Sequence, residues 1–94
     1  MEKVIDKLVA HLPHEMNILK VVEECAELQE VLVKYLTKSE ETKPKKEKII
    51  EEMGDTVFRI VVASRMLDIE VDVQQRMEFK ARQLDKWISD KIKN

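Results

Sequence analysis

Residues 46–67 read KEKIIEEMGDTVFRIVVASRML and include the most apolar segment of the chain. Within this stretch, every residue of the segment 57–63 except Arg59 is apolar. A helix that is apolar on nearly all sides usually lies buried between other elements. The stretch therefore predicts a central, buried helix that starts near Lys46 and continues to about Leu67.

Three further helices are predicted around this segment from apolar residues at helical spacing and from the interruption at Pro13. They are expected at about residues 2–11, 14–37 and 72–92. The polar residues 38–46 contain Pro44 and predict a loop, and we expect the lysines from Lys38 to Lys48 to face solvent. We therefore predict an all-α fold, a helical bundle of four helices with two long antiparallel central ones. Because a chain of 94 residues buries a limited core, we expect dimerisation to complete the bundle.

Length, charge and cysteine content limit the classes of protein to which the chain can belong. Residues 1–94 are expected to form a single domain, and 17 basic and 19 acidic side chains give a formal charge of −2. This balance argues against a nucleic-acid partner held by a broad basic surface. The longest strictly apolar run, residues 60–63, is too short to span a bilayer, and we recognise no signal peptide. With Cys25 as the single cysteine, these features predict a cytoplasmic protein without a membrane partner.

Two pairs of carboxylates occur at helical spacing. Glu24 and Glu27 are three residues apart, as are Glu52 and Asp55, so each pair lies on one face of its helix. If these helices pack face to face, the acidic side chains converge and repel one another unless a hard cation lies between them. Oxygen ligands favour Mg²⁺, with Mn²⁺ as a substitute, and a magnesium site in a small domain suggests phosphate chemistry.

Two other residues of the central helix bear on this site. Gly54 is the only glycine of the chain, and inside a helix it costs about 1 kcal/mol relative to alanine, so we expect another backbone or a ligand to approach closely there. Arg59, four residues after Asp55, is expected to offset part of the negative charge and is also a candidate substrate contact. His11 and His14 do not provide the Glu-x-x-His spacing of di-iron bundles.

These motifs resemble the signature of a known family. Glu-Glu-x-x-Glu followed by Glu-x-x-Asp is typical of the all-α nucleoside triphosphate pyrophosphohydrolases, and the chain looks like a short, single-domain MazG-like member over roughly residues 18–86. The matching residues are Glu23, Glu24, Glu27, Glu52 and Asp55. The resemblance implies hydrolysis of nucleoside triphosphates between the α and β phosphates. The products would be a nucleoside monophosphate and pyrophosphate, in a role of nucleotide-pool housekeeping.

The resemblance also implies roles for individual residues. The Mg²⁺ ligands would be Glu24, Glu27, Glu52 and Asp55. Glu23 and Glu24 would act in catalysis, with Glu23 either supporting the ligands or orienting the attacking water. The implied partners are a nucleotide substrate and a second copy of the chain, in a homodimer or a dimer of dimers.

Basic side chains are needed to hold the substrate phosphates. Lys20 lies one turn before Glu24, and Lys80 is the first choice on the last helix, with Arg59 as the third candidate. Family members often carry a lysine followed by asparagine or arginine on the last helix, and residues 80–86 contain no asparagine.

Two alternative functions remain. A phosphoribosyl-ATP pyrophosphohydrolase usually has an alanine-rich second motif followed by Tyr-His, which residues 51–59 lack. A non-catalytic interaction module would instead use the apolar stripes of its helices to bind a partner helix, with the carboxylates as surface charge.

Overall fold

The structure is a computed structural model that describes residues 1–93. It contains four helices and, within this range, no strand. The helices are α1 (Glu2–His11), α2 (His14–Thr37), α3 (Lys46–Met66) and α4 (Glu70–Lys93). The predicted all-α helical bundle is confirmed, and the main difference is that α4 begins at Glu70 rather than near Asp72. None of these four helices is both long and apolar enough to cross a membrane.

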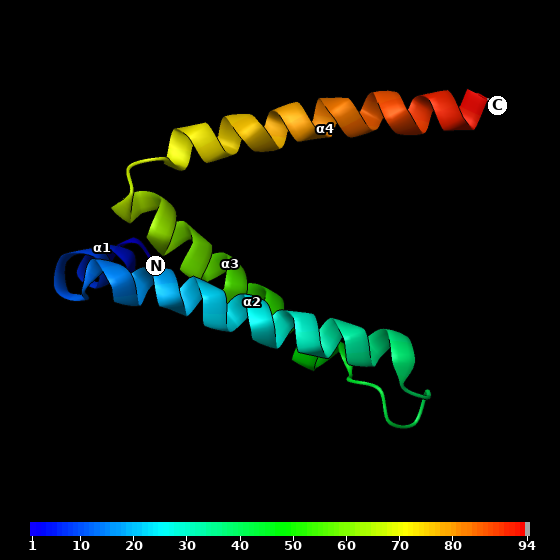
Figure 1. Cartoon of the computed structure of the whole chain (residues 1–94), viewed down its shortest axis with the longest axis horizontal. Helices are drawn as coiled ribbons and strands as arrows, with labels where there is room; N and C mark the ends of the chain where they lie inside the picture. The colour runs from blue at the N-terminus through cyan, green and yellow to red at the C-terminus, as the bar shows by residue number, and fades with distance from the viewer. Residues whose placement is uncertain (94) are drawn as a thin grey trace.

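Helices α2 and α3 form an antiparallel hairpin, and α1 packs against one end of it (Figure 1). At that end the Asn17 amide donates hydrogen bonds to Leu8 O, at 3.2 Å, and to Met66 Sδ, at 3.4 Å. These two bonds join α1, α2 and α3. The buried apolar side chains are Ile5, Val31, Val62 and Ala63. The apolar core is therefore small, as expected for a chain of this length.

The chain leaves α3 through a residue in the left-handed region. Asp68 has a φ of 56°, its N–H donates to Arg65 O at 3.1 Å, and the N–H of Ile69 donates to Ser64 O at 2.9 Å. This pair of bonds is a Schellman motif, in which glycine is the commonest left-handed residue and aspartate is tolerated. The motif is complete at Ile69, so α4 can begin at the next residue.

Helix α4 extends away from the α2–α3 hairpin and has no buried residue in the described chain (Figure 1). Its first turn is held by Arg65 of α3, whose guanidinium lies 3.1 Å from Glu70 of α4. The same guanidinium lies 2.7 Å from Glu2 and 3.1 Å from Asp6 of α1. Beyond this ion-pair cluster α3 and α4 diverge, and an apolar hollow of about 430 Å³ lies between them.

Within the described chain the middle of α3 is not buried on all sides, so the predicted burial does not hold for a single copy. Val62 is 1% exposed, whereas Val57, which lines the hollow beside α4, is 59% exposed. The reason is that α4 leaves this face of α3 open. In total the protein exposes 7718 Å², compared with about 5,700 Å² expected for a folded monomer of 11.1 kDa.

Candidate metal centre

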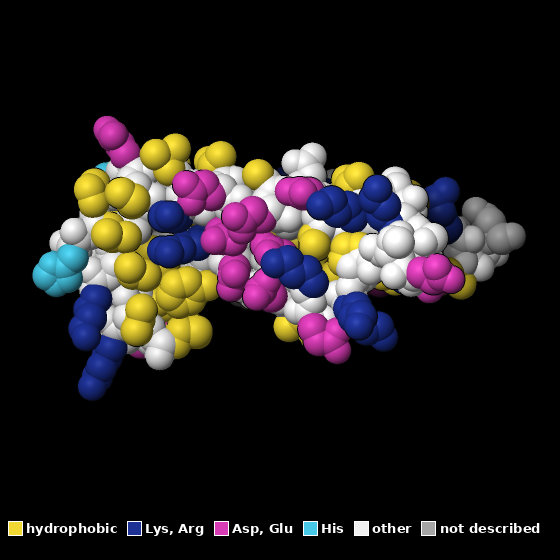
Figure 2. All heavy atoms as spheres, turned by 90° about the horizontal axis from the view of Figure 1, so that it is seen from below, with side chains coloured by type: hydrophobic (Ala, Val, Ile, Leu, Met, Phe, Trp, Pro, Cys, Tyr) yellow, Lys and Arg dark blue, Asp and Glu magenta, His cyan; other side chains and the backbone are white. Residues whose placement is uncertain are grey.

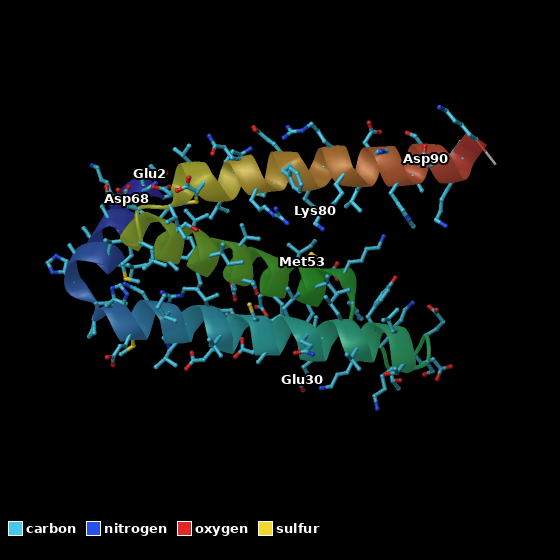
Figure 3. All side chains as sticks on the ribbon, turned by 45° about the horizontal axis from the view of Figure 1, so that its top comes forward. Glu2, Glu30, Met53, Asp68, Lys80 and Asp90 are labelled. Carbon is cyan, nitrogen blue, oxygen red and sulfur yellow. The ribbon has the colours of Figure 1, made fainter. Side chains whose placement is uncertain are left out.

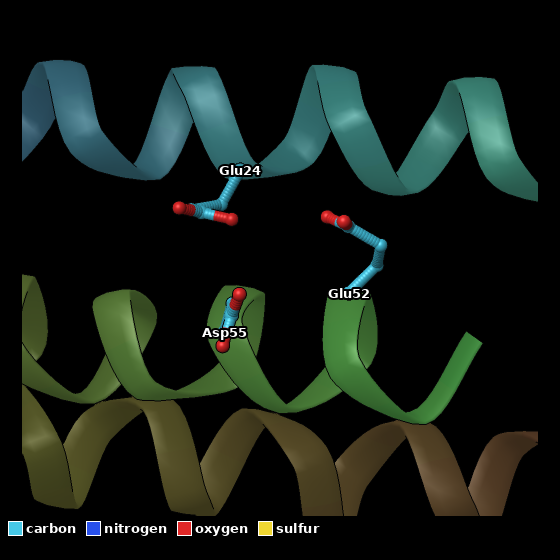
Figure 4. A group of neighbouring side chains, drawn as sticks. All are labelled: Glu24, Glu52 and Asp55. Atoms are coloured by element: carbon cyan, nitrogen blue, oxygen red, sulfur yellow. The ribbon is translucent and has the colours of Figure 1, made fainter. Parts of the chain in front are cut away.

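Three carboxylates meet between α2 and α3 (Figure 4). Glu24 projects from α2 toward Glu52 and Asp55 of α3, and one oxygen atom from each side chain lies within 4.8 Å of the others. Glu52 and Asp55 share a face because they are three residues apart, and the antiparallel pairing of the helices places Glu24 opposite them. The expected convergence of the two acidic motifs therefore occurs for these three residues.

Two oxygen atoms of this group, Glu24 Oε2 and Glu52 Oε2, are buried without a hydrogen-bond partner among residues 1–93. Glu52 is only 5% exposed, Glu24 is half-buried, and Asp55 is exposed. Burying a carboxylate without a partner is costly, and like charges at this separation add repulsion. A hard divalent cation removes both costs, so the oxygen-only donor set fits Mg²⁺ or Mn²⁺ better than a softer metal.

Glu27 lies beside this group, one turn after Glu24 on α2. The negative charge of Glu24, partial loss of solvent and the charge of Glu52, in that order, raise the pKa of Glu27 above its ordinary value. Its side chain is exposed, so it stands at the rim of the carboxylate group rather than inside it. Its role as a fourth ligand stays a prediction.

Lys48 is a neighbour of the carboxylate group. From the sequence it was expected only to face solvent. Its Nζ lies 3.0 Å from Glu52 Oε1 and 2.7 Å from Glu51 Oε2. These two glutamates, Glu51 before Glu52, raise the pKa of Lys48, so the ammonium form is favoured. The spacing of four residues between Lys48 and Glu52 could have predicted this contact, because residues four apart on a helix are neighbours.

A hollow of about 340 Å³ adjoins the carboxylates, and its lining includes Glu27, Glu52, Lys34 and Lys48. Figure 2 shows acidic side chains gathered in the middle of one face of the molecule, with basic side chains on both sides of them. Lys34 is held on the surface of α2 by Glu30, at 2.8 Å. The hollow thus combines carboxylate oxygens with ammonium groups, the two kinds of group that a metal-bound phosphate chain requires.

Glu23 and Lys20 lie outside the carboxylate group. Lys20 Nζ is 3.1 Å from Glu23 Oε2, and this pair of a half-buried lysine and an exposed glutamate occupies the turn of α2 before Glu24. Glu23 is therefore paired with a cation rather than with the other acids. The catalytic role of Glu23 and the substrate contact of Lys20 stay predictions.

Arg59 does not form the expected ion pair with Asp55. Within residues 1–93 no carboxylate lies within 4.0 Å of Arg59, and its Nη1 is buried without a hydrogen-bond partner. Lys80 is an exposed residue of α4 that donates a hydrogen bond to Gln83 Oε1 at 3.1 Å. Because α4 diverges from the hairpin, the chain does not bring Lys80 to its own carboxylates.

Gly54 is exposed on α3, and a methyl group added at its Cα would meet no atom within 4 Å apart from its chain neighbours and the adjacent backbone of its own helix. The close approach expected at this glycine therefore does not occur within the described chain. It stays a prediction for a ligand or for a second copy.

Comparison with known proteins gives a family for the chain. The family model of the MazG nucleotide pyrophosphohydrolase domain matches residues 12–92. No curated protein and no solved structure matched the chain. The matched range includes both acidic motifs and all of α2 and α3. The chain therefore belongs to the MazG nucleotide pyrophosphohydrolase domain family.

Proposed function

We propose that this protein hydrolyses nucleoside triphosphates at the α–β phosphoanhydride bond and releases a nucleoside monophosphate and pyrophosphate, with Mg²⁺ as the cofactor. The observation that carries the proposal is the pair of buried oxygens, Glu24 Oε2 and Glu52 Oε2, that have no partner in residues 1–93. Membership of a nucleotide pyrophosphohydrolase family supports the same reaction class.

Glu24, Glu52 and Asp55 would hold the metal, with Glu27 completing the ligand set from the rim. When bound, Mg²⁺ supplies charge neutralisation for the phosphate oxygens and fixes their position. A carboxylate in this cluster or next to it would accept a proton from the attacking water. Glu24 and Glu23 are the candidates for that role, and Oε2 of Glu23 is paired with Lys20 at 3.1 Å.

Basic side chains on both sides of the carboxylates are suited to the phosphate chain. Arg59 supports this because its guanidinium has no carboxylate partner in the described residues and carries a buried, unpaired Nη1. Lys20 and Arg59 lie on one side of the carboxylate group. Lys34 and Lys48 line the hollow on its other side. Charge-assisted hydrogen bonds from such groups hold phosphates strongly.

We also infer that the protein functions as a homodimer or a dimer of dimers. Met77, Leu84 and Trp87 of α4 are exposed in the described chain, and so is Met53 of α3, which lies on the side of α3 that faces α4 (Figure 3). The surface in excess of that expected for a monomer is roughly 2,000 Å² per chain, so two copies would bury roughly 4,000 Å² in total, within the range of obligate dimer interfaces. A second copy that covers α4 and the open face of α3 would account for it. Lys80 could then contact phosphate only within such an assembly.

The direct test is release of pyrophosphate from a panel of nucleoside triphosphates, with Mg²⁺, with Mn²⁺ and with EDTA. We expect activity with either metal and none with EDTA. Glu52→Gln should lower kcat/KM by at least 100-fold because it removes a ligand, whereas the same change at the exposed loop residue Glu41 should have no effect. Absence of pyrophosphate with every nucleotide, or full activity of Glu52→Gln, would refute the proposal.

The exposed apolar face of α4 is the observation that favours a non-catalytic interaction module. Thermal melting with millimolar Mg²⁺ separates the two functions, because a metal that binds the folded state raises Tm and surface charge alone gives no specific shift. Phosphoribosyl-ATP in the substrate panel tests the other alternative, a phosphoribosyl-ATP pyrophosphohydrolase. A housekeeping role in the cytoplasm stays a prediction.

A further inference from the structure

The hydroxyl of Thr56 joins the two helices at the level of the carboxylates. Thr56 follows Asp55 on α3 and is 4% exposed. Its Oγ1 lies 2.7 Å from the carbonyl oxygen of Glu52 in its own helix and 3.1 Å from the carbonyl oxygen of Glu24 in α2. Both carbonyl groups belong to residues whose side chains form the candidate metal site.

A bond from threonine to the carbonyl four residues earlier is common in helices and serves only its own helix. The contact with Glu24 is different because it crosses the interface between α2 and α3. A carbonyl oxygen has two lone pairs, so Glu24 O can accept this bond in addition to the one within α2. The single proton of the hydroxyl can be shared between the two acceptors.

The interface needs such a link at this level. The buried apolar residues of the hairpin lie toward its two ends, with Val31 on one side of the carboxylates and Val62 and Ala63 on the other. Between them lie the side chains of Glu24, Glu52 and Asp55, with one oxygen of each within 4.8 Å of the others, and like charges this close repel one another. Repulsion between facing helices favours separation or sliding, and a hydrogen bond between the helices opposes both.

We propose that Thr56 is a positioning residue, whose hydroxyl fixes α2 against α3 so that the carboxylate of Glu24 meets those of Glu52 and Asp55. The proposal rests on the proposed metal-dependent function. Thr56 would not contact metal or substrate itself. It would act by holding the main chain of Glu24 in place. A small shift of α2 along α3 would move the Glu24 oxygen more than 4.8 Å from the oxygens of Glu52 and Asp55.

The test compares Thr56→Val, which keeps the shape and loses the hydroxyl, with Thr56→Ser, which keeps the hydroxyl. The binding constant for Mn²⁺ is measured by titration calorimetry, and kcat and KM are measured in parallel. Thr56→Val should weaken Mn²⁺ binding about 10-fold, the effect typical of residues that orient metal ligands, and Thr56→Ser should stay within about threefold of wild type. Higher Mn²⁺ concentration should recover part of the lost turnover.

Ile5→Val is the control for a general loss of stability, because Ile5 is fully buried in α1, away from the carboxylates. It should lower Tm without changing Mn²⁺ affinity. If Thr56→Val does not fold, Thr56→Ala replaces it with the same expected result. Unchanged Mn²⁺ affinity in the folded variant would overturn the proposal and would indicate that the hydroxyl serves only its own helix.

Metal binding and turnover also separate this proposal from the proposed function. Wild-type protein that binds Mn²⁺ but releases no pyrophosphate refutes the proposed reaction. The Mn²⁺ affinity of the Thr56 variants then still tests the positioning role of Thr56. Wild-type protein that binds no Mn²⁺ refutes both.

Discussion

The ammonium group of Lys48 lies 3.0 Å from Glu52 Oε1, while the other oxygen of the same carboxylate is buried and has no hydrogen-bond partner among residues 1–93. The two oxygens of the buried Glu52 carboxylate therefore have different surroundings. Oε1 is paired with Lys48 at the surface, and Oε2 faces the interior of the carboxylate group. Lys48 partly neutralises the cluster from outside and leaves Glu52 Oε2 available to a ligand. Its positive charge also competes with any metal for Glu52.

Lys48→Met is expected to lower the stability of the metal-free protein and to enlarge its response to Mg²⁺. Without the ammonium group the carboxylates repel more strongly, and we expect a modest fall in Tm because Lys48 itself is half exposed. The more negative site then gains more from a divalent ion. Thermal melts in EDTA and in millimolar Mg²⁺ measure both effects, with Lys38→Met, an exposed lysine of the loop, as the control. An unchanged Tm in EDTA would show that Lys48 does not stabilise the cluster.

Glu24→Gln is expected to have the opposite effect without metal. Glutamine has the shape of glutamate, removes one charge and offers an N–H group to the neighbouring Glu52 carboxylate. We expect the free energy of unfolding in EDTA to rise by about 1 kcal/mol, which corresponds to roughly 4–8 °C in Tm for a domain of this size. The Tm shift with Mg²⁺ should disappear. A variant that is less stable in EDTA and still responds to Mg²⁺ would exclude Glu24 from the site.

The pH dependence of stability should have opposite signs at Glu27 and Glu30. Glu24 chiefly raises the pKa of Glu27 above 4.5, so between 4.5 and that higher value the folded state binds more protons than the unfolded state, and Glu27 lowers stability as pH rises. Lys34 lowers the pKa of Glu30, so Glu30 adds stability as pH rises toward 4.5 and keeps it above that value.

Tm measured in EDTA from pH 3 to pH 8 for wild type, Glu27→Gln and Glu30→Gln tests this pair. At neutral pH the Glu27 variant should melt above wild type and the Glu30 variant below it, and both differences should vanish at acidic pH. Two differences of the same sign would contradict the assignment of Glu27 to the carboxylate group.

Helix positions and the meeting of the acidic motifs were predictable because they depend on local rules. Pro13 separates α1 from α2, and Glu52 and Asp55 must share a face of any helix. The start of α4 was misplaced because Asp68, a non-glycine residue, adopts the left-handed conformation that completes the turn. Glycine is the residue usually found in that conformation after a helix, so Asp68 does not predict the short connection between α3 and α4.

The contacts of Lys48 and Thr56 and the direction of α4 were not predictable in the same way. Lysine and threonine are common on helices, and their partners depend on how α2 and α3 are aligned. The apolar stripe of α4 predicts that something covers it, but periodicity is the same whether the cover is the same chain or another one. For this reason the predicted burial of α3 is incomplete within a single chain.

Val57→Glu tests whether a second copy covers the open face of α3. Val57 is 59% exposed in the described chain and lines the hollow beside α4, so a single chain would accept glutamate there with little loss of stability. In a dimer that buries this face, the new carboxylate would lie unpaired in an apolar interface, a cost of several kcal/mol that outweighs many apolar contacts. We therefore expect Val57→Glu to be monomeric at micromolar concentration in sedimentation or light-scattering experiments, with a helical circular dichroism spectrum. Val33→Glu, the same change at a similarly exposed position on α2, should leave the assembly intact. If Val57→Glu has the same mass in solution as wild type, then α3 and α4 do not form the dimer interface.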